Sequence, residues 1–140
     1  MPQTYASEVA GLGTTPVTNS NGAVQGGRVR RFRATITLAS QAVDDTVVLA
    51  QVPAGYAFAY GILNASATLG SSTIAIGIAG TAAKYRAAAV FTAAAPTLFG
   101  ISTAVDDAPL TAQEVVILTN TTATLPASGT LIVDLYFSAP

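Results

Sequence analysis

The chain has 140 residues, a formal net charge of −1 and only 9% charged side chains, although 51% of its residues are hydrophobic. It contains no His, Cys or Trp, and His and Cys are the usual residues of acid–base catalysis near neutral pH and of zinc sites. We therefore expect no enzyme, no cofactor and no metal centre. Polar residues and Gly interrupt every apolar run before it reaches the length of a membrane span, so we expect no transmembrane helix.

The shortage of charge predicts that this protein buries part of its surface against neighbours. A small soluble domain usually needs about a quarter to a third of its surface residues to be charged, which this chain cannot supply. We therefore expect a homo-oligomer or a component of a large assembly. The first five residues have neither the basic nor the apolar region of a secretion signal, so we expect assembly in a cytoplasm.

Residues 1–27 differ from the rest of the chain. They hold seven Gly and Pro residues among Thr, Ser and Asn, without the periodicity of a helix or a strand. We expect a flexible N-terminal arm over residues 1–27 and a single domain over residues 28–140.

Alternating apolar residues predict a strand from residue 30 to residue 38. Asp44 and Asp45 then turn the chain into a second strand, residues 46–52, which is apolar on both faces. Pro and Gly at residues 53–55 favour a turn.

Two further strands are expected over residues 56–68 and 73–79, joined as a hairpin. Small residues on one face of this pair leave room for a closely packed neighbour, so we expect subunits to contact one another there.

The middle of the chain gives a mixed signal. Residues 82–95 are rich in Ala, which favours a helix, but a short strand around residues 90–92 is an equal alternative. Residues 96–110 resemble a loop that holds a short helical or extended piece.

The last two expected strands cover residues 114–119 and 130–137, connected through a turn at residues 125–129. Alternation places a set of apolar side chains in the core: Ile74, Ile76, Leu131, Val133 and Leu135. Many short strands separated by Gly and Pro indicate an all-β fold, an antiparallel β-sandwich or jelly roll with an extended N-terminal arm.

Four of the five Arg residues lie within six positions, Arg28, Arg30, Arg31 and Arg33. Because a guanidinium group binds carboxylate or phosphate with two parallel hydrogen bonds, this cluster is a candidate docking patch for an acidic surface. The alternative is pairing within the protein or its oligomer, with acidic partners Asp44, Asp45, Asp106 and Asp107. A nucleic-acid site would need a wider basic surface with interleaved aromatic residues, so docking on protein is favoured over nucleic-acid binding, and internal pairing stays an equal alternative.

From residue 30 onward the chain resembles small virion proteins of tailed bacteriophages, the head decoration or cement proteins. The resemblance covers about three-quarters of the chain and rests on six phrases: Ala-Thr-Ile-Thr-Leu at 34–38, Asp-Asp-Thr-Val-Val-Leu at 44–49 before the turn Val-Pro-Ala-Gly at 52–55, Gly-Ile-Leu-Asn-Ala-Ser-Ala-Thr-Leu-Gly at 61–70, Thr-Ile-Ala-Ile-Gly at 73–77, Ala-Lys-Tyr at 83–85 and Leu-Pro-Ala-Ser-Gly-Thr-Leu-Ile-Val at 125–133.

This resemblance implies a homo-oligomer, in particular a trimer, that binds the major capsid protein on the outer surface of a phage head and stabilises it. The four arginines would then dock on the capsid, and the protein would be located in the virion after assembly in the host cytoplasm. A virion structural protein of the tail or fibre base is the alternative, followed by a nucleic-acid-binding module. The sequence implies no cofactor and no membrane partner.

Overall fold

The computed structural model describes residues 10, 14–19, 22, 25–105 and 108–140. Within these ranges the chain forms eight strands and one helix of four residues. In chain order they are β1 (Arg28–Thr37), β2 (Thr46–Val52), β3 (Ala57–Ala65), β4 (Thr73–Ile78), β5 (Thr81–Val90), β6 (Thr97–Phe99), α1 (Ser102–Val105), β7 (Glu114–Thr121) and β8 (Thr130–Ala139).

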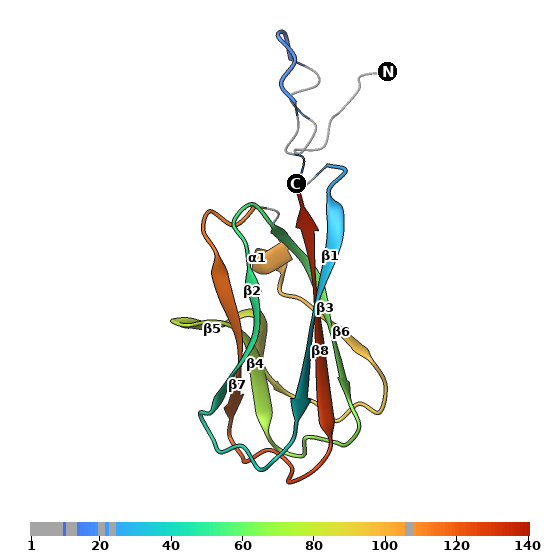
Figure 1. Ribbon diagram of the computed structural model, residues 1–140, viewed down its shortest axis with the longest axis vertical. Coiled ribbons are helices and arrows are strands. Elements are labelled where there is room, and N and C mark those ends of the chain that lie inside the picture. The colour runs from blue at the N-terminus through green and yellow to red at the C-terminus, as the bar shows by residue number, and fades with distance from the viewer. Residues whose placement is uncertain (1–9, 11–13, 20–21, 23–24, 106–107) are drawn as a thin grey trace.

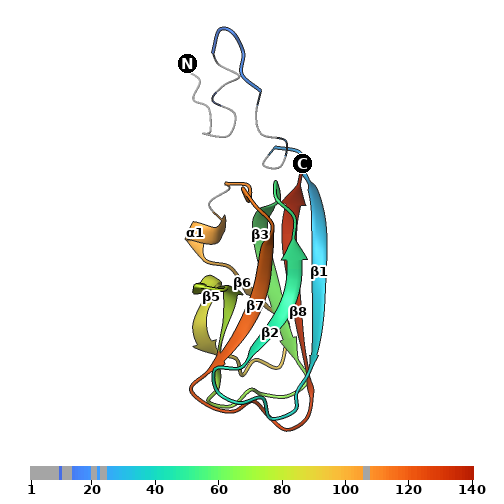
Figure 2. The same ribbon diagram turned by 60° about the vertical axis from the view of Figure 1, so that its left-hand side comes forward.

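The strands form two antiparallel sheets packed face to face (Figures 1 and 2). Sheet A has the order β1-β8-β3-β6 and sheet B the order β2-β7-β4-β5. The hydrogen-bonded pairs β1 with β8, β2 with β7, β3 with β6 and β4 with β5 nest inside one another along the chain. This nesting of eight strands in two sheets is the topology of a jelly roll, so the predicted all-β sandwich is confirmed.

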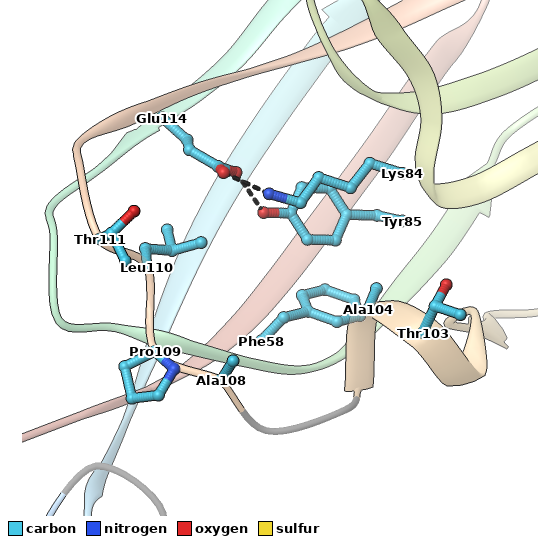
Figure 3. Close-up of a pocket in the computed structure, with 10 residues that line it drawn as sticks. All are labelled: Phe58, Lys84, Tyr85, Thr103, Ala104, Ala108, Pro109, Leu110, Thr111 and Glu114. Atoms are coloured by element: carbon cyan, nitrogen blue, oxygen red, sulfur yellow. Dashed lines mark hydrogen bonds and ion pairs between the residues drawn. The ribbon is translucent and has the colours of Figure 1, made fainter.

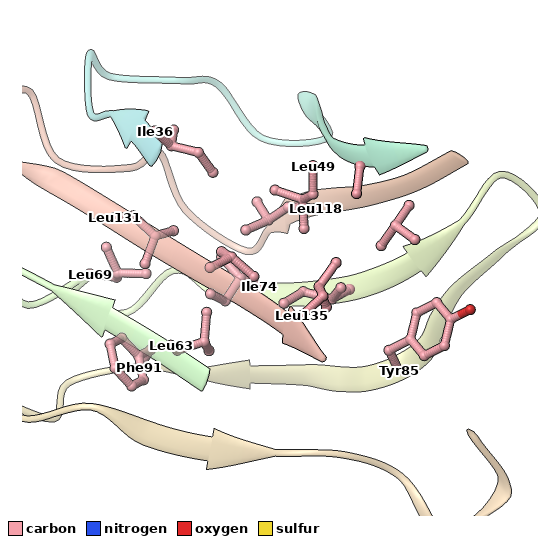
Figure 4. Packing of buried hydrophobic residues seen from close by; sticks show 14 of the residues in the cluster. Ile36, Leu49, Leu63, Leu69, Ile74, Tyr85, Phe91, Leu118, Leu131 and Leu135 are labelled. Atoms are coloured by element: carbon pink, nitrogen blue, oxygen red, sulfur yellow. The ribbon is translucent and has the colours of Figure 1, made fainter. Parts of the chain in front are cut away.

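Side chains from the inner faces of both sheets fill the core (Figure 4). The five residues predicted to be buried, Ile74, Ile76, Leu131, Val133 and Leu135, all have an exposed fraction of 0%. They come from a central strand of each sheet, β4 and β8. Period-2 alternation therefore identified the core correctly, because successive side chains of a strand point to opposite faces.

The predicted hairpin between residues 56–68 and 73–79 is wrong. The two strands exist as β3 and β4, but β3 pairs with β8 and β6 in sheet A while β4 pairs with β5 and β7 in sheet B. The connecting segment crosses the sandwich and buries Leu69 and Ser72. Both strands offer an apolar face to the same core, so they pack face to face, an arrangement that alternation alone cannot distinguish from edge pairing.

The Ala-rich segment forms a strand, β5, and no helix. It pairs with β4 in a register that shifts twice, between Ile74 and Ile76 and between Ile76 and Ile78, so β5 contains extra residues. A Cβ atom on Gly77 would lie 2.2 Å from the carbonyl oxygen of Thr81. The absence of a side chain at Gly77 therefore lets the backbone of β5 pass closely over β4.

The segment expected to be a loop holds both of the alternatives predicted for it, the extended β6 and the short α1. The ring of Phe99 on β6 lies directly over Gly61 of β3, within 2.6 Å of where a Cβ atom would stand. No helix in the described ranges is long and apolar enough to cross a membrane. Much of residues 1–27 lies outside those ranges, so the arm and its boundary with the domain remain a prediction.

Candidate docking surface

All four clustered arginines lie on β1, an edge strand of sheet A. We call Arg28, Arg30, Arg31 and Arg33 the basic edge. Each is exposed. Phe32 on the same strand packs edge-on against Phe137 with 5.7 Å between ring centroids, so β1 is held by an aromatic contact in its middle while its arginines reach outward.

Arg33 forms an ion pair with Asp134, its cross-strand neighbour on β8. Its Nε and Nη2 atoms donate to the two carboxylate oxygens at 2.7 Å each. Asp134 is 6% exposed, and the hydrogen bonds from Arg33 lower the pKa of its carboxyl group, with a smaller contribution from the charge of Arg31. One arginine of the basic edge, Arg33, therefore contributes to the pairing of β1 with β8.

The acidic partners considered for the cluster are placed differently. Asp44 and Asp45 precede β2, and the backbone N–H of Asp44 donates to the carbonyl oxygen of Asn120 on β7. A carboxylate oxygen of Asp45 accepts a hydrogen bond from the backbone N–H of Ala42 at 2.8 Å. Asp106 and Asp107 lie outside the described residues. Internal pairing thus occurs for Arg33, with Asp134, which sequence reasoning did not consider as its partner.

All six basic residues of the chain lie on two edge strands, β1 and β5. On β5, Lys84 pairs with Glu114 and Arg86 donates to the carbonyl oxygens of Ile74, Ala89 and Val90. Charged side chains on an edge strand discourage pairing with the edge of another sheet. The basic residues of β1 and those of β5 can both protect their sheet edges in this way. Among the described residues, Arg28, Arg30 and Arg31 make no ion pair, so these three arginines are available to a partner.

Next to the basic edge, the outer face of sheet A carries large side chains. Tyr60 of β3 and Tyr136 of β8 stack with 4.6 Å between ring centroids and 17° between ring planes. Arg31 is the neighbour of Tyr136 in the register of β1 with β8. Leu98 and Val29 are 68% and 61% exposed. We call Val29, Tyr60, Leu98 and Tyr136 the aromatic face.

Sequence reasoning missed the aromatic face as a unit. Alternation places Tyr60 and Tyr136 on the faces of their strands that point away from the core, but only the register of β3 with β8 brings them side by side. Tyr and Arg are enriched among the residues that contribute most binding energy in protein interfaces, so this surface is a candidate docking site.

A pocket of about 290 Å³ lies beside α1 and the start of β7 (Figure 3). Its polar residues are tied to one another: Lys84 pairs with one carboxylate oxygen of Glu114, and the hydroxyl of Tyr85 donates to the other at 2.6 Å. Burial raises the pKa of Tyr85 far above its ordinary value, with the contact to Glu114 as a second cause. Because both oxygens of Glu114 are engaged, this trio connects β5 to β7 and offers no activated nucleophile.

In the described part of the chain, no three His, Cys, Asp or Glu residues stand close enough together to hold a metal ion.

Comparison of the fold with solved structures finds chains from phage capsids. A chain in the capsid of Ralstonia phage GP4 matches with a TM-score of 0.66 and 21% identity, over 81% of this chain and 86% of that chain. A chain in the capsid asymmetric unit of cyanophage Pam1 matches with a TM-score of 0.63 and 17% identity, over 81% and 86%. A chain in the acid-stable capsid of Helicobacter pylori bacteriophage KHP30 matches with a TM-score of 0.58 and 14% identity, over 80% and 89%.

This chain shares its fold with a chain of each phage capsid. No protein-family model and no curated protein matches its sequence. The likeness extends over nearly the whole sandwich, and at these identities it concerns the fold.

Proposed function

We propose that this protein is a virion structural protein that decorates the outer surface of a tailed-phage capsid as a homo-oligomer, in particular a trimer. The observation that carries the proposal is the fold that it shares with chains of three phage capsids over about four-fifths of its length. The scarcity of charge adds support, because 9% charged residues suit a protein whose surface is covered by neighbours.

The docking surface in this proposal consists of Arg31 of the basic edge and the aromatic face, and the partner is an acidic region of the major capsid protein. Tyr60, Tyr136 and Leu98 would be desolvated in the centre of the contact, where large side chains contribute most binding energy. Arg31 stands beside them and would pair with a capsid carboxylate, forming a charge-assisted hydrogen bond. Pairs at the rim of such a contact weaken as the salt concentration rises.

Decoration would stabilise the capsid by mass action. A protein that binds the assembled shell, and not its separated subunits, stabilises the shell by RT ln(1 + [L]/Kd), which is about 4 kcal/mol at a thousandfold excess over Kd. This mechanism needs no catalytic residue, since the function is the binding energy itself.

The test is binding to capsids that lack the protein, measured by co-sedimentation with nuclease-treated particles. Val29 and Val48 give a matched pair, because both are 61% exposed and they lie on different sheets. Val29→Asp on the aromatic face should weaken binding by more than about tenfold through an unpaired carboxylate in the contact, whereas Val48→Asp should bind as the parent does. Arg31→Ala combined with Tyr60→Ala should weaken binding as Val29→Asp does.

Equal binding by the parent and Val29→Asp would overturn the assigned surface. A parent protein that binds no shell would overturn capsid decoration and leave a tail or fibre-base role. Binding that disappears with nuclease treatment would show a nucleic-acid partner instead. Removal of residues 1–27 tests the predicted arm in the same assay, with weaker binding expected if the arm anchors the protein to neighbouring capsid subunits.

A further inference from the structure

We infer that Arg28 and Arg30 of one copy bind Asp44 and Asp45 of a second copy, and that this contact joins subunits in the oligomer. The inference deepens the proposed function and rests on its homo-oligomer, for which it names the contacting residues. Arg31 is left to the docking surface, because it lies on the opposite face of β1 from Arg28 and Arg30.

In the described part of the chain, some charged groups are engaged internally and others have no ion pair. Two ion pairs are internal, Arg33 with Asp134 and Lys84 with Glu114. Arg86 is engaged with backbone carbonyl oxygens. The charges that remain without an ion pair are three arginines of the basic edge and two acids, Asp44 and Asp45.

The start of β1 and the connection from β1 to β2, which carry these arginines and aspartates, lie at opposite ends of the sandwich (Figure 1). Arg28 pairs in register with Ala139 at the end of β8, next to the C-terminus. Ten residues of β1 separate this end from the segment that contains Asp44 and Asp45, a distance of about 30 Å at 3.3 Å per residue. No copy can therefore pair these groups within itself, whereas two copies can.

The turn that contains Asp44 and Asp45, which we call the acidic turn, is held in place by hydrogen bonds. Asp44 has a φ of 69°, and its N–H donates to the carbonyl oxygen of Asn120 at 2.7 Å. The N–H of Asn120 donates in return to the carbonyl oxygen of Asp45 at 3.1 Å, and the side-chain amide of Asn120 donates to the carbonyl oxygens of Gln41 and Ala42. A turn that is ordered before binding loses little conformational entropy in a complex.

The distribution of charge limits which ends of two copies can meet. We call the start of β1, with Arg28 and Arg30, the basic end. If the basic ends of two copies met, or their acidic turns, like charges would lie together and repel each other. Two copies that exchange both contacts would form a two-fold dimer, whereas a contact that engages a new copy each time passes from subunit to subunit and closes into a ring when the rotation allows. A trimer is a ring of this kind.

Charge reversal tests the contact. Arg28→Glu with Arg30→Glu makes both ends of a copy acidic, and Asp44→Lys with Asp45→Lys makes both ends basic. Each variant alone should self-associate more than about tenfold more weakly than the parent. An equimolar mixture should sediment faster than either variant alone, because each contact between the two variants joins an acidic end to a basic end. A ring of three copies keeps one like-charge contact, so the mixture should associate more weakly than the parent. The association should also weaken with added salt.

Asp106 and Asp107 supply a matched control, since Asp106→Lys with Asp107→Lys makes the same change of charge at the other acidic pair and should leave association unchanged. Thermal melts check that each variant is folded. Asp44→Asn with Asp45→Asn is a milder second variant, because Asn tolerates a positive φ and its side-chain oxygen can still accept the hydrogen bond from Ala42; it should also associate more weakly.

A parent protein that is monomeric at every concentration, a mixture that stays dissociated, or association lost equally in the Asp106 and Asp107 control would overturn the inference. Shell binding is measured separately with the same proteins. Loss of self-association together with retained shell binding supports the inference and leaves the docking surface intact, whereas a parent that forms the oligomer but binds no shell overturns only the proposed decoration.

Discussion

At the scale of single residues, Asn120 organises one end of the sandwich. It is 1% exposed. Its side-chain oxygen accepts a hydrogen bond from the hydroxyl of Ser72, and its amide donates to the carbonyl oxygens of Gln41 and Ala42 at 3.2 and 2.9 Å. Two connecting segments, β1 to β2 and β3 to β4, are thereby fixed to one buried amide on β7, and any replacement that cannot hydrogen-bond leaves several buried polar groups unpaired.

Val133 offers a direct test of the core. It lies on β8 with an exposed fraction of 0%, whereas Val48 on β2 is 61% exposed. Val133→Ala removes two buried methyl groups and leaves a cavity, so we expect the free energy of unfolding to fall by about 2 kcal/mol. Val48→Ala, the same substitution at an exposed site, should change it by less than about 0.5 kcal/mol. Urea unfolding measures both, and similar losses for the two variants would contradict the assigned core.

The pair of Arg33 and Asp134 predicts a loss of stability in acid. Hydrogen bonds from Arg33 hold the pKa of Asp134 below its ordinary value of 3.8 in the folded protein. The unfolded chain therefore takes up this proton first as the pH falls. The contribution of the pair to stability is complete above pH 3.8 and is lost as the pH falls from there through the lower pKa of the folded state.

Unfolding by urea at a series of pH values measures this effect. Asp134→Asn should remove part of the decline in stability below pH 3.8, because it removes the titrating group. Arg33→Gln should also remove this part, because without Arg33 the burial of Asp134 acts to raise its pKa. If Asp134→Asn retains the full decline of the parent, the acid sensitivity comes from other carboxyl groups.

At the scale of elements, the close passage of β5 over β4 depends on Gly77. A Cβ atom there would lie 2.2 Å from the carbonyl oxygen of Thr81 and 2.6 Å from backbone atoms of Ala82. Backbone cannot move aside as a flexible side chain can, so Gly77→Ala should destabilise the protein by about 1 to 3 kcal/mol or more. Gly22 has nothing within 4 Å, and Gly22→Ala is the matched control. Equal melting temperatures for both variants would show that β5 has room to shift.

The elements also show what the sequence determines alone. The positions of β1 and β8 follow from alternation, because each has one face against the core. The positions of β2 and β7 follow from short apolar runs between turn residues. The partner of β3 does not, because its apolar pattern fits a hairpin with β4 as well as the observed pairing with β8. The Ala residues of β5 favour a helix in isolation, and pairing with β4 overrides that preference.

Only part of the proposed docking surface could be predicted from the sequence. The basic edge is visible as a cluster in the sequence, since its four arginines are neighbours in the chain. The stacking of Tyr60 on Tyr136 joins residues from strands far apart in sequence and depends on register. The partner of Arg33 was hidden for the same reason, because Asp134 is 101 positions away.

At the scale of the whole molecule, charge is confined to a few places while most of the surface is neutral. Outward-facing positions of sheet B carry Thr and Val, with Val48 and Val115 61% and 41% exposed. The aromatic face, the basic edge and the acidic turn are therefore the places where a partner can gain specific energy. Neutral surfaces give little electrostatic repulsion between protein molecules, so a protein of this composition favours stable association with neighbouring subunits.

The last prediction concerns the division between the arm and the domain. Every strand begins at Arg28 or later, and no buried core residue in the described ranges precedes Ile36. Removal of residues 1–27 should therefore leave the domain folded, with a melting temperature within a few degrees of the parent, because no described residue before Arg28 belongs to the core. Removal of residues 1–37 is the contrasting control. It deletes β1 and with it Phe32 and Ile36, which pack in the core, and should abolish cooperative melting. If the shorter deletion is as damaging as the longer one, the arm is part of the domain, and a loss of shell binding on its removal would then reflect unfolding and not a missing anchor.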